Sequence, residues 1–234
     1  MEFKDLKIVL PTCDKYMFVI EALAYTVEKF WPDHQPIILV GYEAPKFELP
    51  DSWSFVSLGK DRGAKKWGDD MLTFFKDFDD EHFIYIEDDI LLLTDVNTDK
   101  MEYMFKMMDD KTPKANIAGA HMERPERWID LNDNEVVELK QDINYRTSRG
   151  CSIWNTKFFL SYVKPNQSPW DYESAHPKND GLRILSTKGQ PPFVWSHLFI
   201  KMGQFSTKKW WYHTHTNIGL EGEDKKYCAK ILKI

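Results

Sequence analysis

Three adjacent acids, Glu87, Asp88 and Asp89, lie between two apolar runs. The run before them, residues 82–86, is short and apolar and is therefore predicted to be a buried strand. The acids mark the point where this strand leaves the core, and in open α/β sheets ligands bind at that edge. Adjacent carboxylates repel one another unless a cation or a basic partner offsets their charge. The stretch predicts a ligand site at a sheet edge, and a solvated acidic turn is the plainer alternative.

Carboxylate oxygens are hard ligands, the kind that Mg²⁺ and Mn²⁺ prefer. In proteins these ions are commonly shared between one or two carboxylates and the phosphates of a bound substrate. We therefore expect Mn²⁺ or Mg²⁺ as the cofactor, held by acids of the triplet together with a phosphate-containing donor.

Strand-like and helix-like segments alternate through the first part of the chain. Strands are predicted over 7–11, 35–41, 53–58 and 82–86, and helices over 16–30 and 67–78. Strand and helix in this rhythm indicate a mainly parallel sheet. The predicted fold class is α/β, with a mostly parallel central sheet flanked by helices.

Beyond the acids the alternation loosens. A helix over 99–110 with Thr98 as its cap is predicted first, and Ser168, Pro169 and Asp171 open a second helix with the pattern of a capping box. Further predictions are strands over 115–120, 134–139 and 145–154, and a helix over 155–163. Residues 178–234 predict strands and loops without clear periodicity. No repeat or long linker divides the chain, so one domain over residues 1–234 is expected.

Composition excludes several functional classes. A formal net charge of −6 and a pI of about 5.7 argue against nucleic acid as a partner, because proteins that bind it show a basic face. Cys13, Cys151 and Cys228 are far apart and form no CxxC pair, which indicates a reducing compartment and no zinc knuckle or disulfide framework. No signal-peptide pattern and no apolar run of roughly 18 residues is visible, so we expect a cytoplasmic location without an integral membrane segment.

The order of these segments resembles a GT-A type glycosyltransferase, a nucleotide-sugar-dependent enzyme with a Rossmann-like half and an acceptor half. Residues 7–14 resemble the family's opening strand and loop, and residues 84–89 resemble its DxD position. Stretches within 146–173 resemble a group of viral and bacterial enzymes that build surface glycans. The resemblance covers about residues 5–175. It implies a nucleotide-binding half over about 1–95, and an acceptor half with the C-terminal segment over about 96–234.

The resemblance also implies donor-binding and metal-binding residues, with a UDP-sugar as the expected donor. Thr12 and Asp14 match the family's loop that holds the nucleoside. Asp61, Arg62 and Asp70 match its contacts to the base, ribose or diphosphate. Asp88 matches a position that contacts the ribose or the sugar. An ordinary acid on a helix surface is the alternative for Asp70. The family's triplet begins with Asp, whereas this one begins with Glu87. The expected metal ligands are therefore Asp89 first and Glu87 second.

An inverting glycosyl transfer needs a general base beside the acceptor hydroxyl. Asp171 and Glu173 are the candidates, with Asp171 first. An acid at the start of a helix is equally explained as a capping residue, because it interacts favourably with the helix dipole. A retaining mechanism would need no such base.

The late histidines His213 and His215 alternate in an extended segment, which places both imidazoles on one face. In the family a late histidine sometimes completes the metal shell, so both are candidate ligands, with an ordinary surface or core pair as the alternative. Residues 208–222 combine an aromatic cluster with glycines and are expected to order over the donor as a lid. A permanently packed segment or an interfacial membrane patch would explain the same composition.

Together these patterns predict a metal-dependent glycosyltransferase that moves a sugar from a nucleotide-sugar donor to a saccharide acceptor hydroxyl in glycan synthesis. A nucleotidyltransferase of related fold is the nearest alternative, because it shares the fold and the metal chemistry. A non-catalytic carbohydrate-binding module is the alternative from another class, and it has no need of adjacent acids at a strand end.

Overall fold

Four parallel strands form the first half of the sheet in the computed structural model, which describes residues 1–117, 125–175, 178–196, 200–201, 204–205, 212–213 and 218–233. They lie in the order β3-β2-β1-β4. Their bounds are β1 Lys7–Pro11, β2 Ile37–Gly41, β3 Trp53–Ser57 and β4 His82–Tyr85. The chain moves outward from β1 to β2 and β3 and then returns to place β4 on the other side of β1. Such a switch point between two neighbouring strands is where open α/β sheets bind ligands.

The sheet becomes mixed beyond β4. β8 Ser152–Asn155 pairs antiparallel with β4, and the order continues β8-β5-β9-β7-β6 to give a nine-stranded sheet in the described part of the chain. The other strands of this sheet are β5 Lys114–Asn116, β6 Trp128–Asp130, β7 Val136–Leu139 and β9 Ile184–Thr187. Two short ladders pair β10 Ile200–Lys201 with β11 Gln204–Phe205, and β12 Tyr212–His213 with β13 Ile218–Gly219. The predicted α/β class with parallel central strands is confirmed.

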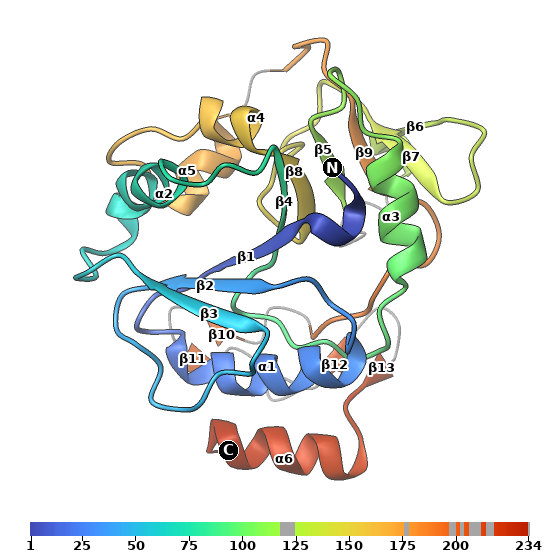
Figure 1. Ribbon diagram of the computed structural model, residues 1–234. Helices are drawn as coiled ribbons and strands as arrows, with labels where there is room; N and C mark the ends of the chain where they lie inside the picture. Colours follow the sequence, from blue (N-terminus) through green and yellow to red (C-terminus); the bar gives the residue numbers. More distant parts are fainter. Residues whose placement is uncertain are drawn as a thin grey trace.

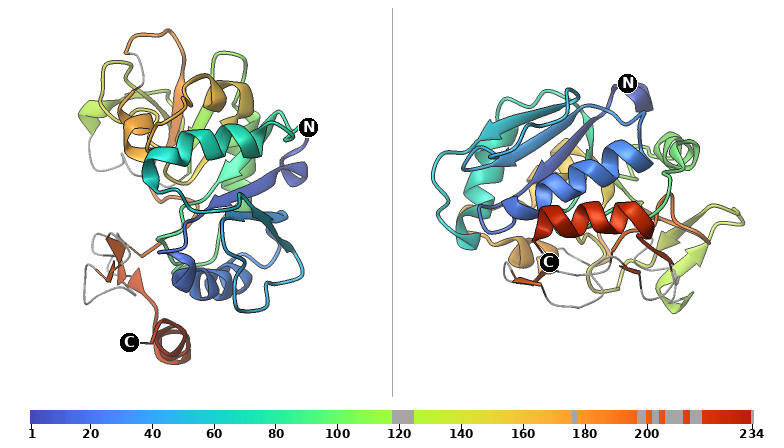
Figure 2. Two further views of the ribbon diagram at one scale, coloured as in Figure 1. Left: turned by 90° about the vertical axis from the view of Figure 1, so that its left-hand side faces the viewer. Right: turned by 90° about the horizontal axis from the view of Figure 1, so that it is seen from below.

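Helices cover both faces of the sheet (Figure 1). On one face α1 Met17–Phe30 packs against β1, and α6 Gly222–Leu232 runs beside α1 (Figure 2). The opposite face carries α2 Trp67–Phe75, α4 Thr156–Ser161 and α5 Pro169–Ser174. The remaining helices are α3 Thr98–Lys106 and the 3₁₀ helices η1 Phe3–Asp5, η2 Ala64–Lys66 and η3 Pro125–Arg127. Within the described residues, none of these helices combines the length and the apolar character needed to cross a bilayer.

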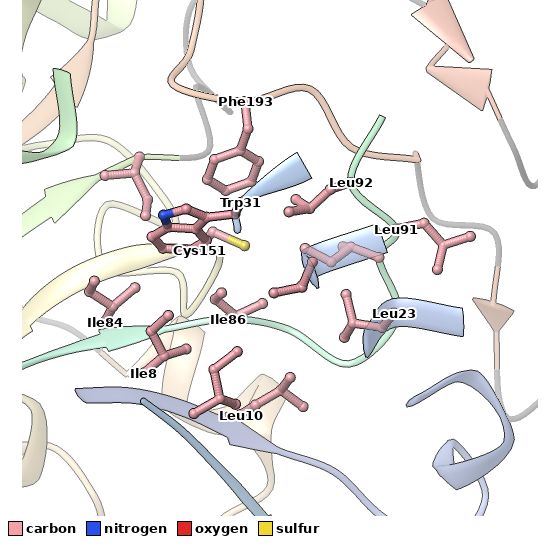
Figure 3. Packing of buried hydrophobic residues seen from close by; sticks show 14 of the residues in the cluster. Ile8, Leu10, Leu23, Trp31, Ile84, Ile86, Leu91, Leu92, Cys151 and Phe193 are labelled. Carbon is pink, nitrogen blue, oxygen red and sulfur yellow. The ribbon is translucent and has the colours of Figure 1, made fainter. Parts of the chain in front are cut away.

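Side chains alternate along β4, and this alternation separates two cores. Ile84 joins Ile8 and Leu10 of β1 in the larger core, on the face that α1 covers (Figure 3). Phe83 and Tyr85 belong to the second core, which is rich in aromatic rings from α2, α4 and α5. The acids that follow Tyr85 therefore leave the sheet between two packed layers.

Two element predictions are wrong. The strand predicted over 145–154 begins only at Ser152, because residues 144–147 form a turn in which Tyr145 adopts a φ of 58°. The prediction of strands and loops for residues 178–234 misses α6, on which Cys228 and Leu232 are the buried residues. A helix with so narrow an apolar stripe shows little periodicity in its sequence.

The observed ends of the other elements differ less from the predicted ends. The cap of α3 is Asn97, whose side-chain oxygen accepts the Lys100 N–H at 2.9 Å, so the prediction of Thr98 as the cap is wrong by one residue. The capping box of α5 is confirmed, since Ser168 and Asp171 each accept the other's backbone N–H. The predicted strand over 115–120 corresponds to β5, and its last three residues lie outside the described residues.

A prediction concerns Gly68, where α2 approaches the loop before α5. A Cβ there would lie 2.0 Å from the Lys164 carbonyl oxygen, and Gly68 already donates its N–H to Gln167 at 2.9 Å. We expect Gly68→Ala to lower the free energy of unfolding by about 2 kcal/mol, because the backbone must shift to admit a methyl group. Urea denaturation measures this, with Gly150→Ala as the control, since a Cβ at Gly150 meets nothing within 4 Å. Equal stability of the two variants would contradict the close approach.

Candidate active site

The acid triplet follows β4 after one further residue, Ile86, at the edge where β1 also ends. Thr12, the residue after β1, donates from Oγ1 to Asp88 Oδ2 at 2.8 Å, and its N–H donates to the Val40 carbonyl of β2 at 2.8 Å. Since β1 and β4 are neighbours in the sheet, this contact bridges the switch point between them. The structure thus brings together two of the predicted donor-binding residues.

The guanidinium of Arg149 lies beside the triplet. Arg149 comes shortly before β8, whose first residue pairs with Tyr85, the last residue of β4. Its Nη1 donates to the Tyr85 hydroxyl at 2.7 Å, and its Nη2 lies 3.7 Å from Glu87 Oε1. The guanidinium carbon lies 5.7 Å from the ring centroid of Trp67 and 5.8 Å from that of Tyr85, within the range of cation–π contacts. Arg149 therefore supplies a positive charge next to the acids.

Glu173 meets the triplet through the same arginine. Its Oε1 accepts the backbone N–H of Arg149 at 2.9 Å and lies 3.8 Å from the Nε of that side chain. α5 presents Glu173 at this place because the preceding residue, Tyr172, is fully buried against Trp67 and Phe159. Of the two predicted base candidates, Glu173 is the one that shares Arg149 with the triplet.

Asp171 has different partners. Its Oδ2 accepts from the backbone N–H and the hydroxyl of Ser168 at 3.0 and 2.7 Å, and from Lys65 Nζ at 2.8 Å. The hydrogen bonds from Lys65 and Ser168 hold the pKa of Asp171 well below its usual value. A carboxylate with such a pKa is a weak proton acceptor near neutral pH. Asp171 acts as the capping acid of α5.

Burial raises the pKa of every acid in the triplet. The pKa of Glu87 and that of Asp89 rise to about 7, and that of Asp88 rises to about 6. Burial is the largest cause for all three, neighbouring carboxylates add to it, and the positive charge of Arg149 opposes it. In the absence of a further cation, the triplet is therefore only partly ionised near neutral pH.

Lys114 on β5 is a fully buried cation close to the same acids. Its Nζ donates to the Ser148 carbonyl at 2.5 Å and lies 4.6 Å from the ring centroid of Trp154. Burial lowers the pKa of Lys114 to about 7, although the negative charges of Glu173 and Glu87 oppose this shift. The bond to Ser148 ties the residue before the arginine to the sheet, so the loop that carries the guanidinium is fixed in place.

Asp70 lies in the first turn of α2 and is almost completely buried. Its carboxylate forms an ion pair with Arg62 and accepts the hydroxyl of Tyr42 at 2.7 Å. Tyr42 directly follows β2, so this group stands at the same sheet edge as the triplet. The alternative of an ordinary surface acid does not describe Asp70.

Asp14 and Asp61 accept backbone N–H groups in nearby loops, at 3.1 Å from Glu43 and 2.7 Å from Gly63. Their neighbour Cys13 shows how close these loops are to the triplet. Burial and the middle acid of the triplet raise the pKa of Cys13 to about 11, and the charge of Asp61 adds to this rise. The predicted donor-binding residues therefore follow the ends of β1, β3 and β4, apart from Asp70, which lies in the first turn of α2.

The predicted metal site is only partly described. Among the residues that the structure describes, no three or more His, Cys, Asp or Glu side chains are grouped so as to hold a metal ion. The backbone of His213 lies in β12, but its side chain and the whole of His215 lie outside the described residues. Most of the predicted lid over 208–222 also lies outside them, and its last residue, Gly222, begins α6.

Two cavities in the described part of the chain lie elsewhere. One, of about 370 Å³, is lined by Lys100, Glu135 and Lys188, and the other, of about 440 Å³, is lined by His82 and Lys157 among others. Neither includes an acid of the triplet. We therefore identify the candidate active site by the charged and hydrogen-bonded contacts at the switch point between β1 and β4, and not by a cavity.

The sequence did not single out four residues that complete this site, namely Tyr42, Tyr85, Lys114 and Arg149. Three of them carry a hydroxyl or a charge at or near the end of an observed strand, since Tyr42 follows β2, Lys114 begins β5 and Arg149 shortly precedes β8. Tyr85 gives no signal in the sequence, because an aromatic residue within a strand is ordinary core.

No family model matches the sequence, and no curated protein matches it either. Solved structures do match. UTP-bound UGPase from Acinetobacter baumannii gives a TM-score of 0.52 at 12% identity, over 85% of this chain and 90% of that chain. UDP-glucose pyrophosphorylase complexed with UDP-glucose gives 0.49 at 12% identity, over 82% and 92%. The galactosyltransferase LgtC, in complex with donor and acceptor sugar analogs, gives 0.38 at 15% identity, over 67% and 60%.

At 12% identity, the similarity to the A. baumannii enzyme shows the fold alone. The chain has the Rossmann-like α/β fold that sugar nucleotidyltransferases share with GT-A glycosyltransferases. The fold expected from the family resemblance is thereby confirmed.

The raised pKa of Asp89 predicts how stability depends on pH. A carboxyl whose pKa rises on folding stabilises the protein below its unfolded pKa, and this contribution is lost as the pH rises through the folded pKa. For Asp89 the interval runs from 3.8 to about 7. Without divalent metal, we expect Asp89→Asn to raise the free energy of unfolding by about 1–3 kcal/mol at about pH 8 and by much less at about pH 4. Chemical denaturation at both pH values, with the exposed Asp51→Asn as control, checks this, and a difference independent of pH would contradict it.

Proposed function

We propose that this chain is a metal-dependent glycosyltransferase that moves a sugar from a nucleotide-sugar donor to a saccharide hydroxyl. The observation that carries the proposal is the position of Glu173, bonded to the Arg149 N–H at 2.9 Å beside the triplet. An acceptor hydroxyl must lose its proton during transfer, and in this proposal Glu173 would accept it. In nucleotidyl transfer to a sugar phosphate, the attacking phosphate oxygen is already ionised at neutral pH, so no base is needed.

The charges of the site fit a divalent cation. When all groups are ionised, the triplet and Glu173 carry four negative charges, against two positive charges on Arg149 and Lys114. Burial is the largest cause of the raised pKa values of the three acids, and negative charge that is not fully offset adds to it. Asp89 and Glu87 would hold Mn²⁺ or Mg²⁺, together with phosphate oxygens of the donor. The bound ion would offset the charge that develops on the leaving diphosphate.

The donor would lie across the ends of β1, β2 and β3. We assign the donor contacts to Thr12, Asp14, Asp61, Arg62, Asp70 and Asp88, with Tyr42 as an addition from the structure. The fold that the chain shares with a UTP-bound enzyme supports a uridine nucleotide, and hence a UDP-sugar. The free thiols of Cys13, Cys151 and Cys228 support a location in the cytoplasm, which is a reducing compartment.

A sugar nucleotidyltransferase is the second candidate, because the A. baumannii UGPase has the same fold over 85% of this chain. The reaction products separate the two functions. A glycosyltransferase releases a nucleoside diphosphate from the donor, whereas a nucleotidyltransferase releases pyrophosphate from a nucleoside triphosphate. Assaying both products over a panel of nucleotide sugars, and of nucleoside triphosphates with sugar phosphates, tests the proposal. Pyrophosphate release without any transfer from a nucleotide sugar would reject it, and a carbohydrate-binding module would give neither product.

The metal assignment predicts a pH-dependent response to Mn²⁺ alone. A cation competes with protons for carboxylates of raised pKa, so Mn²⁺ should raise the melting temperature more at about pH 8 than at about pH 5.5. Asp89→Asn should abolish this shift and the Mn²⁺-dependent stabilisation by the donor, and Asp51→Asn should retain both. Differential scanning fluorimetry measures these shifts. An unchanged Mn²⁺ response in Asp89→Asn would show that Asp89 is not a ligand.

The base assignment predicts different effects for the two acids of α5. Glu173→Gln should lower kcat by about 10²-fold or more with donor affinity near normal, since a general base typically contributes that much. Asp171→Asn should retain turnover and lose stability by about 0.5–2 kcal/mol, because it weakens the cap of α5. Steady-state kinetics and thermal unfolding separate these outcomes. The reverse pattern would return the base role to Asp171, and full activity of both variants would indicate a retaining mechanism.

A further inference from the structure

We propose that Arg149 is a positioning residue that fixes Glu173 relative to Glu87, and so sets where the acceptor hydroxyl meets the donor. The inference rests on the proposed function, in which Glu173 is the base and Glu87 a metal ligand. The two carboxylates come from segments far apart in the sequence, and Arg149 forms an ion pair with each. A single side chain therefore contacts both the proposed metal ligand and the proposed base.

Arg149 is itself fixed from several sides. Its backbone N–H bonds to Glu173, its Nη1 bonds to the Tyr85 hydroxyl, and the Lys114 ammonium bonds to the carbonyl of the preceding residue. The guanidinium also lies within cation–π range of Trp67. With only 15% of the side chain exposed, few other orientations are open to it. A guanidinium held in this way can keep both carboxylates in fixed positions relative to each other.

In the two ion pairs, the guanidinium attracts the carboxylates without forming hydrogen bonds to their oxygens. The Nη2–Glu87 distance of 3.7 Å and the Nε–Glu173 distance of 3.8 Å exceed hydrogen-bond lengths. Consistently, Nε of Arg149 has no hydrogen-bond partner among the described residues. Lone pairs on Glu87 and Glu173 stay available for a metal ion and for a hydroxyl proton. Without the positive charge, the two carboxylates would repel one another across the site.

A lysine would replace this arrangement only in part. The planar guanidinium presents separate N–H groups toward Tyr85, Glu87 and Glu173 while its face meets an aromatic ring. An ammonium group is a compact charge. It restores the electrostatic attraction, but it does not present separate N–H groups in the directions of these three partners. A lysine variant should therefore recover some of the activity that a neutral variant loses, which a role in packing alone would not produce.

Arg146 provides a matched control on the same loop. It is also a buried arginine, with Nη1 donating to Asp180 at 2.9 Å and Nη2 donating to the Leu182 carbonyl. Its Nε also has no hydrogen-bond partner among the described residues. Neither of its partners is an acid of the site, so substitutions at Arg146 report the effect of losing a buried arginine in this loop.

The experiment compares Arg149→Gln and Arg149→Lys with Arg146→Gln and Arg146→Lys. For each protein we would measure kcat and KM for donor and acceptor, the melting temperature, and a double-mutant stability cycle with Glu173→Gln. We expect Arg149→Gln to lower kcat by about 10²-fold, as loss of a base does, and Arg149→Lys to recover about 10-fold of this. The donor KM should change by less than about threefold, because the guanidinium is mostly covered. The cycle should show coupling between Arg149 and Glu173 and none between Arg146 and Glu173.

Several results would overturn the proposal. A kcat loss no larger than that of the Arg146 variants would make Arg149 a structural residue. A large rise in donor KM with unchanged kcat would make it a diphosphate ligand. If the wild-type protein releases no nucleoside diphosphate, the proposed function fails, and the stability cycle then decides about Arg149 by itself. Absence of coupling would reject the positioning of Glu173 by Arg149, whereas coupling would support it for whichever reaction the site performs.

Discussion

Repulsion among the carboxylates that follow β4 is the constraint on which this sheet edge depends. Three acids in sequence leave a buried strand, and burial raises the pKa of each. The fold offsets their charge from two directions, with the Thr12 hydroxyl bonded to Asp88 and the Arg149 guanidinium beside Glu87. Neither residue is near the triplet in sequence, so the site forms only when β1, β4 and β8 have paired. Tertiary structure and charge balance are therefore coupled at this edge.

The sequence predicts the parts of the fold that local rules determine. The β1 to β4 region follows from short apolar runs that alternate with helical segments, and the capping box of α5 follows from the spacing of Ser168 and Asp171. The antiparallel pairing of β8 with β4 is beyond such rules, because no local pattern selects the partner of a strand. That pairing brings Arg149 to Tyr85, 64 residues away in sequence, and so creates the contact that the sequence could not indicate. α6 was missed because its buried stripe is too narrow to give a clear period.

The two acids of α5 show how local structure directs a site. Asp171 completes the cap of the helix, and this sets where the first turn begins. Tyr172 then enters the aromatic core, and Glu173 comes to the backbone of Arg149. The sequence ranks Asp171 before Glu173 as the base, but both acids lie in one motif, and only the partners of each side chain distinguish them. The capping role of Asp171 is in this sense a condition for the position of Glu173.

The fold alone does not distinguish a glycosyltransferase from a nucleotidyltransferase, since both bind a phosphate-containing donor at the carboxyl ends of β1 and β4. What differs is the proton of the second substrate: a sugar hydroxyl has one to lose, and a phosphate does not. A base is useful only if it lies beside the donor site and keeps an oxygen available. Glu173 is bonded to a backbone N–H and lies 3.8 Å from the Nε of Arg149, a distance at which charge attracts without forming a hydrogen bond. That balance between holding the carboxylate and leaving it able to accept a proton is the physical reason why we propose hydroxyl chemistry for this site.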